Sequence, residues 1–117
     1  MGFAKCFDVV TMVTDEATEQ FGSLLCEDKT QKEALKAYCG MIDSLAERFD
    51  GVSFEAEVDD ETTDITVSLV CGEFEIDNCS DDFYKLVEAA KRVSFKAMDD
   101  NTIQIGFKFG GIWVKAS

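Results

Sequence analysis

Apolar residues recur three and four positions apart at the start of the chain, a spacing that gathers side chains on one helix face. This spacing predicts a helix over residues 2–27. A strand over residues 4–13 is the competing interpretation, because Val9, Val10 and Val13 are β-branched. Strict alternation of apolar and polar residues fails there, so the helix is preferred. Its predicted apolar face consists of Phe3, Phe7, Val10, Thr14, Ala17, Phe21 and Leu24.

A second helix is predicted over residues 31–50, where the apolar spacing is clearer. Thr30 and Glu33 form a capping box, in which each side chain accepts a hydrogen bond from the other residue's backbone N–H. Gly51 follows as the expected left-handed residue that ends the helix. The short link over residues 27–29 makes the two helices antiparallel neighbours. The predicted buried stripe consists of Leu35, Tyr38, Ile42, Leu45 and Phe49.

From Val52 onward apolar and polar residues alternate, which is the pattern of strands with one buried face. The alternation predicts a hairpin with a turn over residues 59–62. A bulge at residues 71–72 would keep Phe74 and Ile76 on the buried face of a continued strand. The predicted cross-strand pairs are 58 with 63, 56 with 65 and 54 with 67.

Helical spacing returns over residues 81–92, with Ser80 as the expected N-cap and Lys91 and Arg92 in the last turn. Its predicted stripe consists of Phe83, Leu86, Val87 and Ala90. The remaining residues predict a three-stranded meander with Gly110-Gly111 as its second turn. The facing residues are Val93 and Phe107, Phe95 and Ile105, Ala97 and Ile103, Phe109 and Ile112, Phe107 and Val114, and Ile105 and Ala116.

These elements predict a single domain over residues 1–117 in the order α-α-β-β-α-β-β-β. The expected class is α+β, with an antiparallel sheet of about five strands and helices packed on one face. Hydrophobic residues make up 46% of the chain, which is enough to form a core.

The charge is distributed unevenly along the chain. No lysine or arginine occurs between Arg48 and Lys85, and those thirty-six residues hold twelve of the twenty-four acids. The formal net charge is −13. Because phosphate recognition needs net positive charge, this balance argues against direct binding of nucleic acid or of an anionic membrane. It favours a basic protein partner or cations.

Motifs for catalysis and cofactor binding are missing from the sequence. The chain has no histidine and no C-x-x-C pair, so neither a zinc site nor a histidine base is expected. No phosphate-binding loop or nucleophile elbow occurs, so we expect a protein that is not an enzyme and holds no cofactor. Five cysteines, no apolar run of membrane length and no signal peptide predict a cytoplasmic protein with reduced thiols. The cysteines are Cys6, Cys26, Cys39, Cys71 and Cys79.

An acidic surface is the main candidate for a binding site. The predicted hairpin places its acids on the outer face and at the tip, and the continued strand extends the array. Alternate residues on a strand lie about 6.5–7 Å apart, close to the separation of successive phosphates on a nucleic-acid strand. A solvated face that only keeps the protein soluble is an equally weighted alternative. A calcium loop is disfavoured because residues 59–64 lack the required pattern and glycine. The candidate residues are Glu55, Glu57, Asp59, Asp60, Glu61, Asp64, Glu73, Glu75 and Asp77.

Trp113 is a second candidate for partner binding. The meander predicts that it faces outward opposite Lys108, with Lys96 and Lys115 nearby. An exposed tryptophan among basic residues is typical of an interface anchor. The alternative is a tryptophan covered by a helix or packed on lysine stems. A basic-aromatic patch of this kind would complement the acidic hairpin in sign, which suggests self-association as a hypothesis.

Two function classes follow from these features. In size, charge and lack of catalytic motifs the chain resembles small acidic phage-encoded antagonists, including anti-CRISPR proteins, although no sequence motif is shared. That resemblance implies an inhibitor that mimics nucleic acid and occludes a basic nucleic-acid-binding site on a partner protein. The alternative is an acidic adaptor or secretion-chaperone-like module, often dimeric, that binds a protein partner through an apolar surface.

Overall fold

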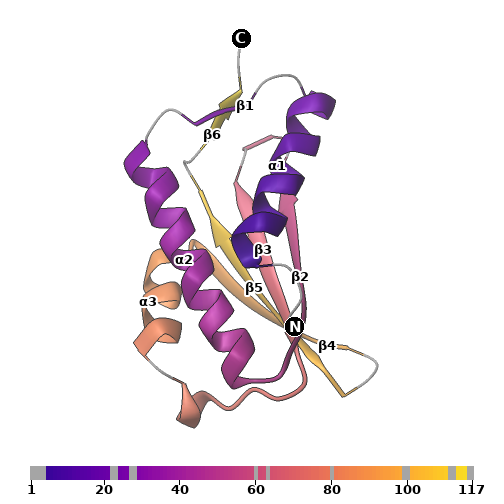
Figure 1. Ribbon diagram of the computed structural model, residues 1–117, viewed down its shortest axis with the longest axis vertical. Coiled ribbons are helices and arrows are strands. Elements are labelled where there is room, and N and C mark those ends of the chain that lie inside the picture. Colours follow the sequence, from indigo (N-terminus) through magenta and orange to yellow (C-terminus); the bar gives the residue numbers. More distant parts are fainter. Residues whose placement is uncertain are drawn as a thin grey trace.

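Four strands form one antiparallel sheet in the order β2-β3-β5-β4, and helices pack against one of its faces (Figure 1). The computed structural model describes residues 5–21, 24–26, 29–59, 61–62, 64–79, 81–98, 101–110 and 113–115, with side chains described except at 17–21, 24–26, 29–31 and 113–115. The elements are α1 (Cys6–Phe21), β1 (Leu24–Cys26), α2 (Lys29–Arg48), β2 (Gly51–Val58), β3 (Ile65–Cys71), the 3-10 helix η1 (Ile76–Asn78), α3 (Asp81–Ala89), β4 (Arg92–Ala97), β5 (Ile103–Phe109) and β6 (Trp113–Lys115). The α+β class is confirmed. Among the described residues, the main sheet has four strands rather than about five.

The helix predicted at the start of the chain forms as α1 but is shorter than expected, and the strand predicted at the other end pairs differently. The first helix ends at Phe21, and β1 follows where the sequence pattern predicts more helix. The strand alternative over residues 4–13 is wrong, because α1 begins at Cys6. β6 pairs with β1 rather than with β5, so the predicted hairpin across Gly110-Gly111 is also wrong. The helix is expected to continue past Phe21, but glycine and serine at positions 22 and 23 favour a helix less than their neighbours do. The pairing of β1 with β6 joins distant segments, so no local pattern in the sequence predicts it.

The second helix confirms its predicted stripe, since Leu35, Ile42, Leu45 and Phe49 are buried. Tyr38 is half-buried and stacks on Phe109, with ring centroids 5.0 Å apart. The first helix docks on the second through Asp43, whose Oδ1 accepts a hydrogen bond of 2.9 Å from the backbone N–H of Cys6. That contact satisfies a donor at the start of α1, where helix N–H groups lack partners within the helix. Helix α2 begins at Lys29, before the predicted cap Thr30, whose side chain lies outside the described residues.

The end of α2 differs from the prediction. Asp50, with φ of 58°, is the left-handed residue, and Gly51 is the first residue of β2. Short polar residues adopt this conformation more readily than most because the side chain bonds locally. Gly51 has a different reason to be glycine, since it lies against Ala46 of α2.

The hairpin of β2 and β3 has the predicted faces but not the predicted register. The observed pairs are Val58 with Ile65, Ala56 with Val67 and Phe54 with Leu69, two residues away from the expected alignment. Because side chains alternate with a period of two, a shift of two leaves every residue on its predicted face. The connection therefore spans residues 59–64 and is longer than the predicted four-residue turn.

The strand β3 ends at Cys71 and does not continue through a bulge. Gly72 N–H donates to Asp50 O at 3.1 Å, and Glu73 N–H donates to Phe49 O at 3.3 Å, so the chain turns towards the end of α2. Phe74 packs against the core as predicted, whereas Ile76 lies on η1 and is exposed. The register irregularity is on β2, between Gly51 and Ser53.

The third helix is shorter than predicted. It ends at Ala89, and Arg92 is the first residue of β4. Lys91 lies between them, and its backbone N–H donates to Lys108 O at 2.7 Å. Phe83 and Leu86 are buried as predicted, but Val87 is exposed. Ser80, the expected cap, lies outside the described residues.

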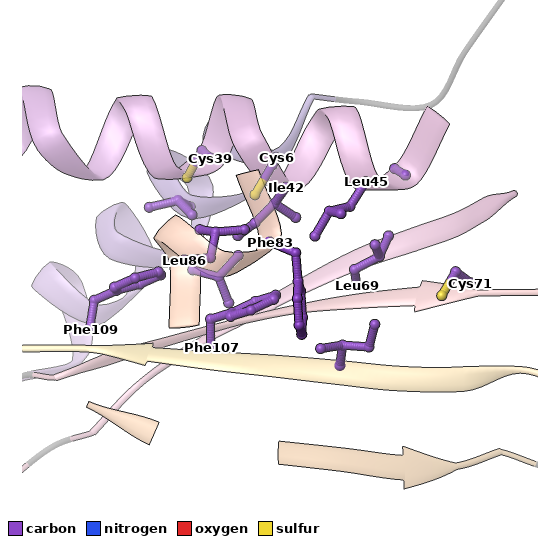
Figure 2. Packing of buried hydrophobic residues seen from close by; sticks show 14 of the residues in the cluster. Cys6, Cys39, Ile42, Leu45, Leu69, Cys71, Phe83, Leu86, Phe107 and Phe109 are labelled. Carbon is purple, nitrogen blue, oxygen red and sulfur yellow. The ribbon is translucent and has the colours of Figure 1, made fainter. Parts of the chain in front are cut away.

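The hairpin of β4 and β5 has the predicted register. Val93 pairs with Phe107, Phe95 with Ile105 and Ala97 with Ile103. The core lies between this sheet and the helices, where Phe83 and Leu86 of α3 point towards Phe107 of β5 (Figure 2). Within the described residues, no helix is both long enough and apolar enough to cross a lipid bilayer.

Candidate binding surface

The sheet face opposite the helices carries most of the polar residues that the strands direct outward. Because side chains alternate across a strand, the cross-strand pairs assign residues to this open face in rows running from β2 through β3 and β5 to β4. The rows are Glu57, Thr66, Lys108 and Arg92; Glu55, Ser68, Gly106 and Ser94; and Ser53, Val70, Gln104 and Lys96. Carboxylates therefore lie on the β2 edge of the open face, and basic groups lie on β5 and β4.

Glu55 and Glu57 are exposed, as the alternation of the sequence predicts. They belong to β2, the outermost strand of the main sheet on this side. The Glu55 carboxylate accepts a hydrogen bond from the side-chain amide of Gln104 on β5. Glu55 therefore reaches across β3, which lies between β2 and β5 in the sheet.

Asp59 holds the turn at the end of this edge. Its Oδ1 accepts hydrogen bonds from the backbone N–H groups of Thr62 and Glu61, at 3.1 and 2.8 Å. These bonds lower the pKa of Asp59, because they favour the charged carboxylate. Glu61 is exposed beside it. Asp60, the third acid predicted at the tip, lies outside the described residues.

Asp64 does not lie on the outer surface, contrary to the prediction from alternation. It is only 5% exposed, and its Oδ2 lies 3.0 Å from Lys91 Nζ and 3.8 Å from Lys108 Nζ. Gly110 makes room for it, since a Cβ at that position would lie 2.6 Å from Asp64 Oδ1. The buried carboxylate is thus part of an ion pair with Lys91, just before the first residue of β3.

Replacing Asp64 by asparagine should lower the free energy of unfolding by about 1–2 kcal/mol. The change keeps the size of the side chain but removes the charge that Lys91 and Lys108 face. The side chain of Lys91 is largely exposed, so solvent limits the loss. Glu57→Gln is the matched control, because it removes an exposed carboxylate and should change stability by no more than about 0.5 kcal/mol. Urea unfolding of both variants checks this, and equal stabilities would contradict the internal role of Asp64.

The acids Glu73, Glu75 and Asp77 are exposed but lie apart from the turn. They belong to the segment after β3 and to η1, so the prediction that they continue the strand is wrong. The turn lies at the opposite end of β3, about 20 Å away for a seven-residue strand at roughly 3.3 Å per residue. The predicted array therefore divides into two groups. The acidic edge, defined as Glu55, Glu57, Asp59 and Glu61, is the group that lies on and beside the sheet edge.

The basic residues of the open face differ from the predicted patch around Trp113. Trp113 pairs with Cys26 through β6 and β1, and its side chain is outside the described residues. Lys108 lies between Thr66 and Arg92 instead of opposite Trp113. The sequence pattern predicts Arg92 in the last turn of a helix, whereas it is the first residue of β4. The alternation of Arg92, Ser94 and Lys96 is the signal that identifies it as an open-face residue of β4.

The buried cysteines of the described residues are poorly suited to nucleophilic attack. Cys6, Cys39 and Cys71 are free and buried. A hydrogen bond to Cys39 together with burial raises the pKa of the Cys6 thiol, and burial raises the pKa of Cys71, so both thiols are poor nucleophiles. No three cysteine or acidic side chains of the described residues come together to hold a metal ion. A shallow, open hollow is lined by Ser44, Glu47, Arg48 and Asp82.

Comparison with protein-family models, curated proteins and solved structures found no match to this chain. The surface itself therefore carries the functional inference.

Proposed function

We propose that the protein binds a basic surface of a partner protein through the acidic edge and thereby excludes nucleic acid from that surface. The observation that supports this most directly is the exposure of Glu55 and Glu57 on an outermost strand, next to a turn that adds Asp59 and Glu61. In this proposal the protein acts by occupancy, as nucleic-acid mimics and anti-CRISPR-like inhibitors do, and needs neither a catalytic group nor a cofactor.

The spacing of the acidic edge supports a mimic of a phosphate backbone. Glu55, Glu57 and Asp59 are alternate residues of one extended segment, so their backbone positions repeat at about 6.5–7 Å. Hydrogen bonds to Asp59 lower its pKa and keep that carboxylate ionised to lower pH than usual. A row of fixed negative charges on a rigid strand meets a basic groove with little conformational cost.

The position of the basic residues supports an approach of the partner from the β2 edge. Lys108, Arg92 and Lys96 lie across the open face from β2, on the far strands of the sheet. A basic partner is repelled there and attracted at the β2 edge and its turn. The expected contact is therefore the edge and the tip of the hairpin rather than the whole face, with steering that weakens as salt rises.

Two triple charge reversals test this proposal with equal changes in net charge. Glu55→Lys, Glu57→Lys and Glu61→Lys together reverse the acidic edge without touching Asp59, which holds the turn. The control variant carries Glu73→Lys, Glu75→Lys and Asp77→Lys, which are also exposed. Each variant changes the formal charge from −13 to −7. The edge variant should lose partner binding, and the control should keep most of it.

The measurement is association with a panel of basic nucleic-acid-binding proteins, including RNA-guided nucleases with and without their guide, at low and high salt. The proposal predicts tight binding by wild type that weakens steeply with salt. It predicts a loss of at least roughly tenfold for the edge variant, because several attractive pairs become repulsive. Equal losses in both variants would mean that only net charge matters and would contradict the assignment of the site.

An apolar binding surface, as in an adaptor or secretion-chaperone-like module, is the second candidate. It is favoured by exposed aromatic side chains, since Tyr84 and Phe95 are about half exposed. They are connected through Phe83 and Phe74, with successive ring centroids between 5.3 and 5.8 Å apart. Binding through this surface should depend little on salt and should be lost in Tyr84→Ser while surviving the reversal of the acidic edge.

A further inference from the structure

The two outermost strands of the main sheet can continue one another's hydrogen-bonding pattern. β2 and β4 lie at opposite edges of the order β2-β3-β5-β4, and every neighbouring pair is antiparallel. Three antiparallel steps make β2 and β4 run in opposite directions. Two copies of the chain related by a translation across the strands would therefore bring β4 of one copy next to β2 of the other in an antiparallel arrangement, with their open faces on the same side.

The outer edge of β4 offers backbone groups for such a pairing. Met98 N–H donates to Thr102 O at 2.8 Å at the start of the β4–β5 ladder. By the alternation of antiparallel pairs, the backbone groups of Val93, Phe95 and Ala97 point away from β5. Among the described residues no strand pairs with that edge. An exposed edge of this kind is a template for another strand.

Charge selects which edges meet. On the open face β4 presents Arg92 and Lys96, both exposed, and β2 presents Glu55 and Glu57, both exposed. Pairing of two β4 edges would oppose bases to bases, and pairing of two β2 edges would oppose acids to acids, which is unfavourable across strands. Only pairing of β4 with β2 sets opposite charges side by side.

Exposed apolar residues occur at both edges. On the helix-facing side of β4, Phe95 is 51% exposed, because its side chain lies at the margin of the core. At the other edge Val52 of β2 is 55% exposed. Helix α1, which packs against β2, leaves Met12 exposed. Burial of such side chains between copies adds a favourable term that does not depend on salt.

We propose that a second copy of this chain docks its β2 edge on the β4 edge of the first and extends the antiparallel sheet. The contact uses different surfaces on the two copies, so it is heterologous and can add further copies. It does not rest on the function proposed above. It has one consequence for that function, because a copy seated on β2 covers Glu55 and Glu57 and excludes a basic partner from the same edge.

A charge-swap experiment tests this docking in the protein alone. One variant carries Glu55→Lys and Glu57→Lys, and the other carries Arg92→Glu and Lys96→Glu. In either variant alone, the two edges have the same sign and repel. In an equimolar mixture, the β2 edge of each variant is opposite in sign to the β4 edge of the other. A control with Lys32→Glu and Lys85→Glu, both exposed on helices, has the same net charge as the second variant.

Sedimentation velocity over a concentration series is the measurement, with circular dichroism to verify that each variant is folded. We expect wild type and the control to gain mass with concentration, each edge variant alone to associate roughly tenfold more weakly or not at all, and the mixture to regain association.

A wild type that stays monomeric at every concentration overturns the proposal. So does a mixture that remains monomeric, or an edge variant that associates as wild type does. A control that loses association as strongly as the Arg92→Glu and Lys96→Glu variant also overturns it. Because no partner is present, these results are independent of the binding test on the panel of basic proteins.

Discussion

Replacing Phe107 by alanine should lower the free energy of unfolding by about 3–5 kcal/mol. Phe107 is 0% exposed and lies at the centre of the core, with its ring 6.4 Å from that of Phe83 in an edge-to-face arrangement. Its removal loses the transfer free energy of a whole aromatic side chain and leaves a cavity among close-packed neighbours. Because small domains are marginally stable, a loss of this size should remove a large share of the total stability.

The control for this prediction is Phe95→Ala, which makes the same chemical change on the adjacent strand. Phe95 is about half exposed, so its replacement should cost only about 1 kcal/mol. Urea unfolding at low protein concentration, where copies are kept apart, measures both variants. Similar costs for the two variants would contradict the placement of the core between the helices and β5.

Substitution of two glycines by alanine should have effects of opposite sign. A Cβ on Gly51 would lie 2.6 Å from Ala46 Cβ and 3.0 Å from Ala46 Cα. Those atoms belong to the last turns of α2 and cannot rotate away, so Gly51→Ala should destabilise the protein by about 3 kcal/mol. Gly40 lies on the exposed side of α2, and a Cβ there meets nothing within 4 Å. Gly40→Ala should therefore stabilise the helix by about 0.4–1 kcal/mol.

Thermal and urea unfolding of the two glycine variants show whether the effect of an added Cβ depends on the space around each glycine. The close contact at Gly51 explains why glycine follows α2 even though Asp50 adopts the left-handed conformation. A Gly51→Ala variant as stable as wild type would mean that β2 does not begin directly against α2. A destabilised Gly40→Ala variant would mean that Gly40 faces a neighbour in the folded protein.

Local periodicity was sufficient to predict the elements whose partners are close in sequence. The stripe of α2 follows from spacing alone, and the register of β4 with β5 follows from a short connection between two alternating segments. The predicted register of β2 with β3 differs from the observed register by two residues, because any even shift leaves the same residues on the buried face. The longer turn is stabilised by Asp59, whose side-chain bonds to Glu61 and Thr62 are a detail that alternation does not reveal.

Features that depend on distant parts of the chain were not predictable. The pairing of β1 with β6 joins segments almost ninety residues apart. The alternating pattern predicts that Asp64 is exposed. Its burial is explained by the space at Gly110 and by the approach of Lys91. Lys91 and Arg92 are typical of the last turn of a helix. In the structure α3 ends at Ala89, Lys91 follows the helix and Arg92 is the first residue of β4. Because the sequence pattern assigns Arg92 to a helix, it does not predict that Arg92 and Lys96 lie on the same face of β4.

Displacement of nucleic acid from a basic protein tests the central claim most directly. A fluorescent oligonucleotide bound to a member of the panel is titrated with wild type, with the Glu55, Glu57 and Glu61 reversal, and with the Glu73, Glu75 and Asp77 reversal, at two salt concentrations. The proposal predicts that wild type and the second variant release the oligonucleotide, less effectively at high salt, and that the first variant does not. An oligonucleotide that stays bound while wild type binds the same protein, or equal release by both variants, would contradict it.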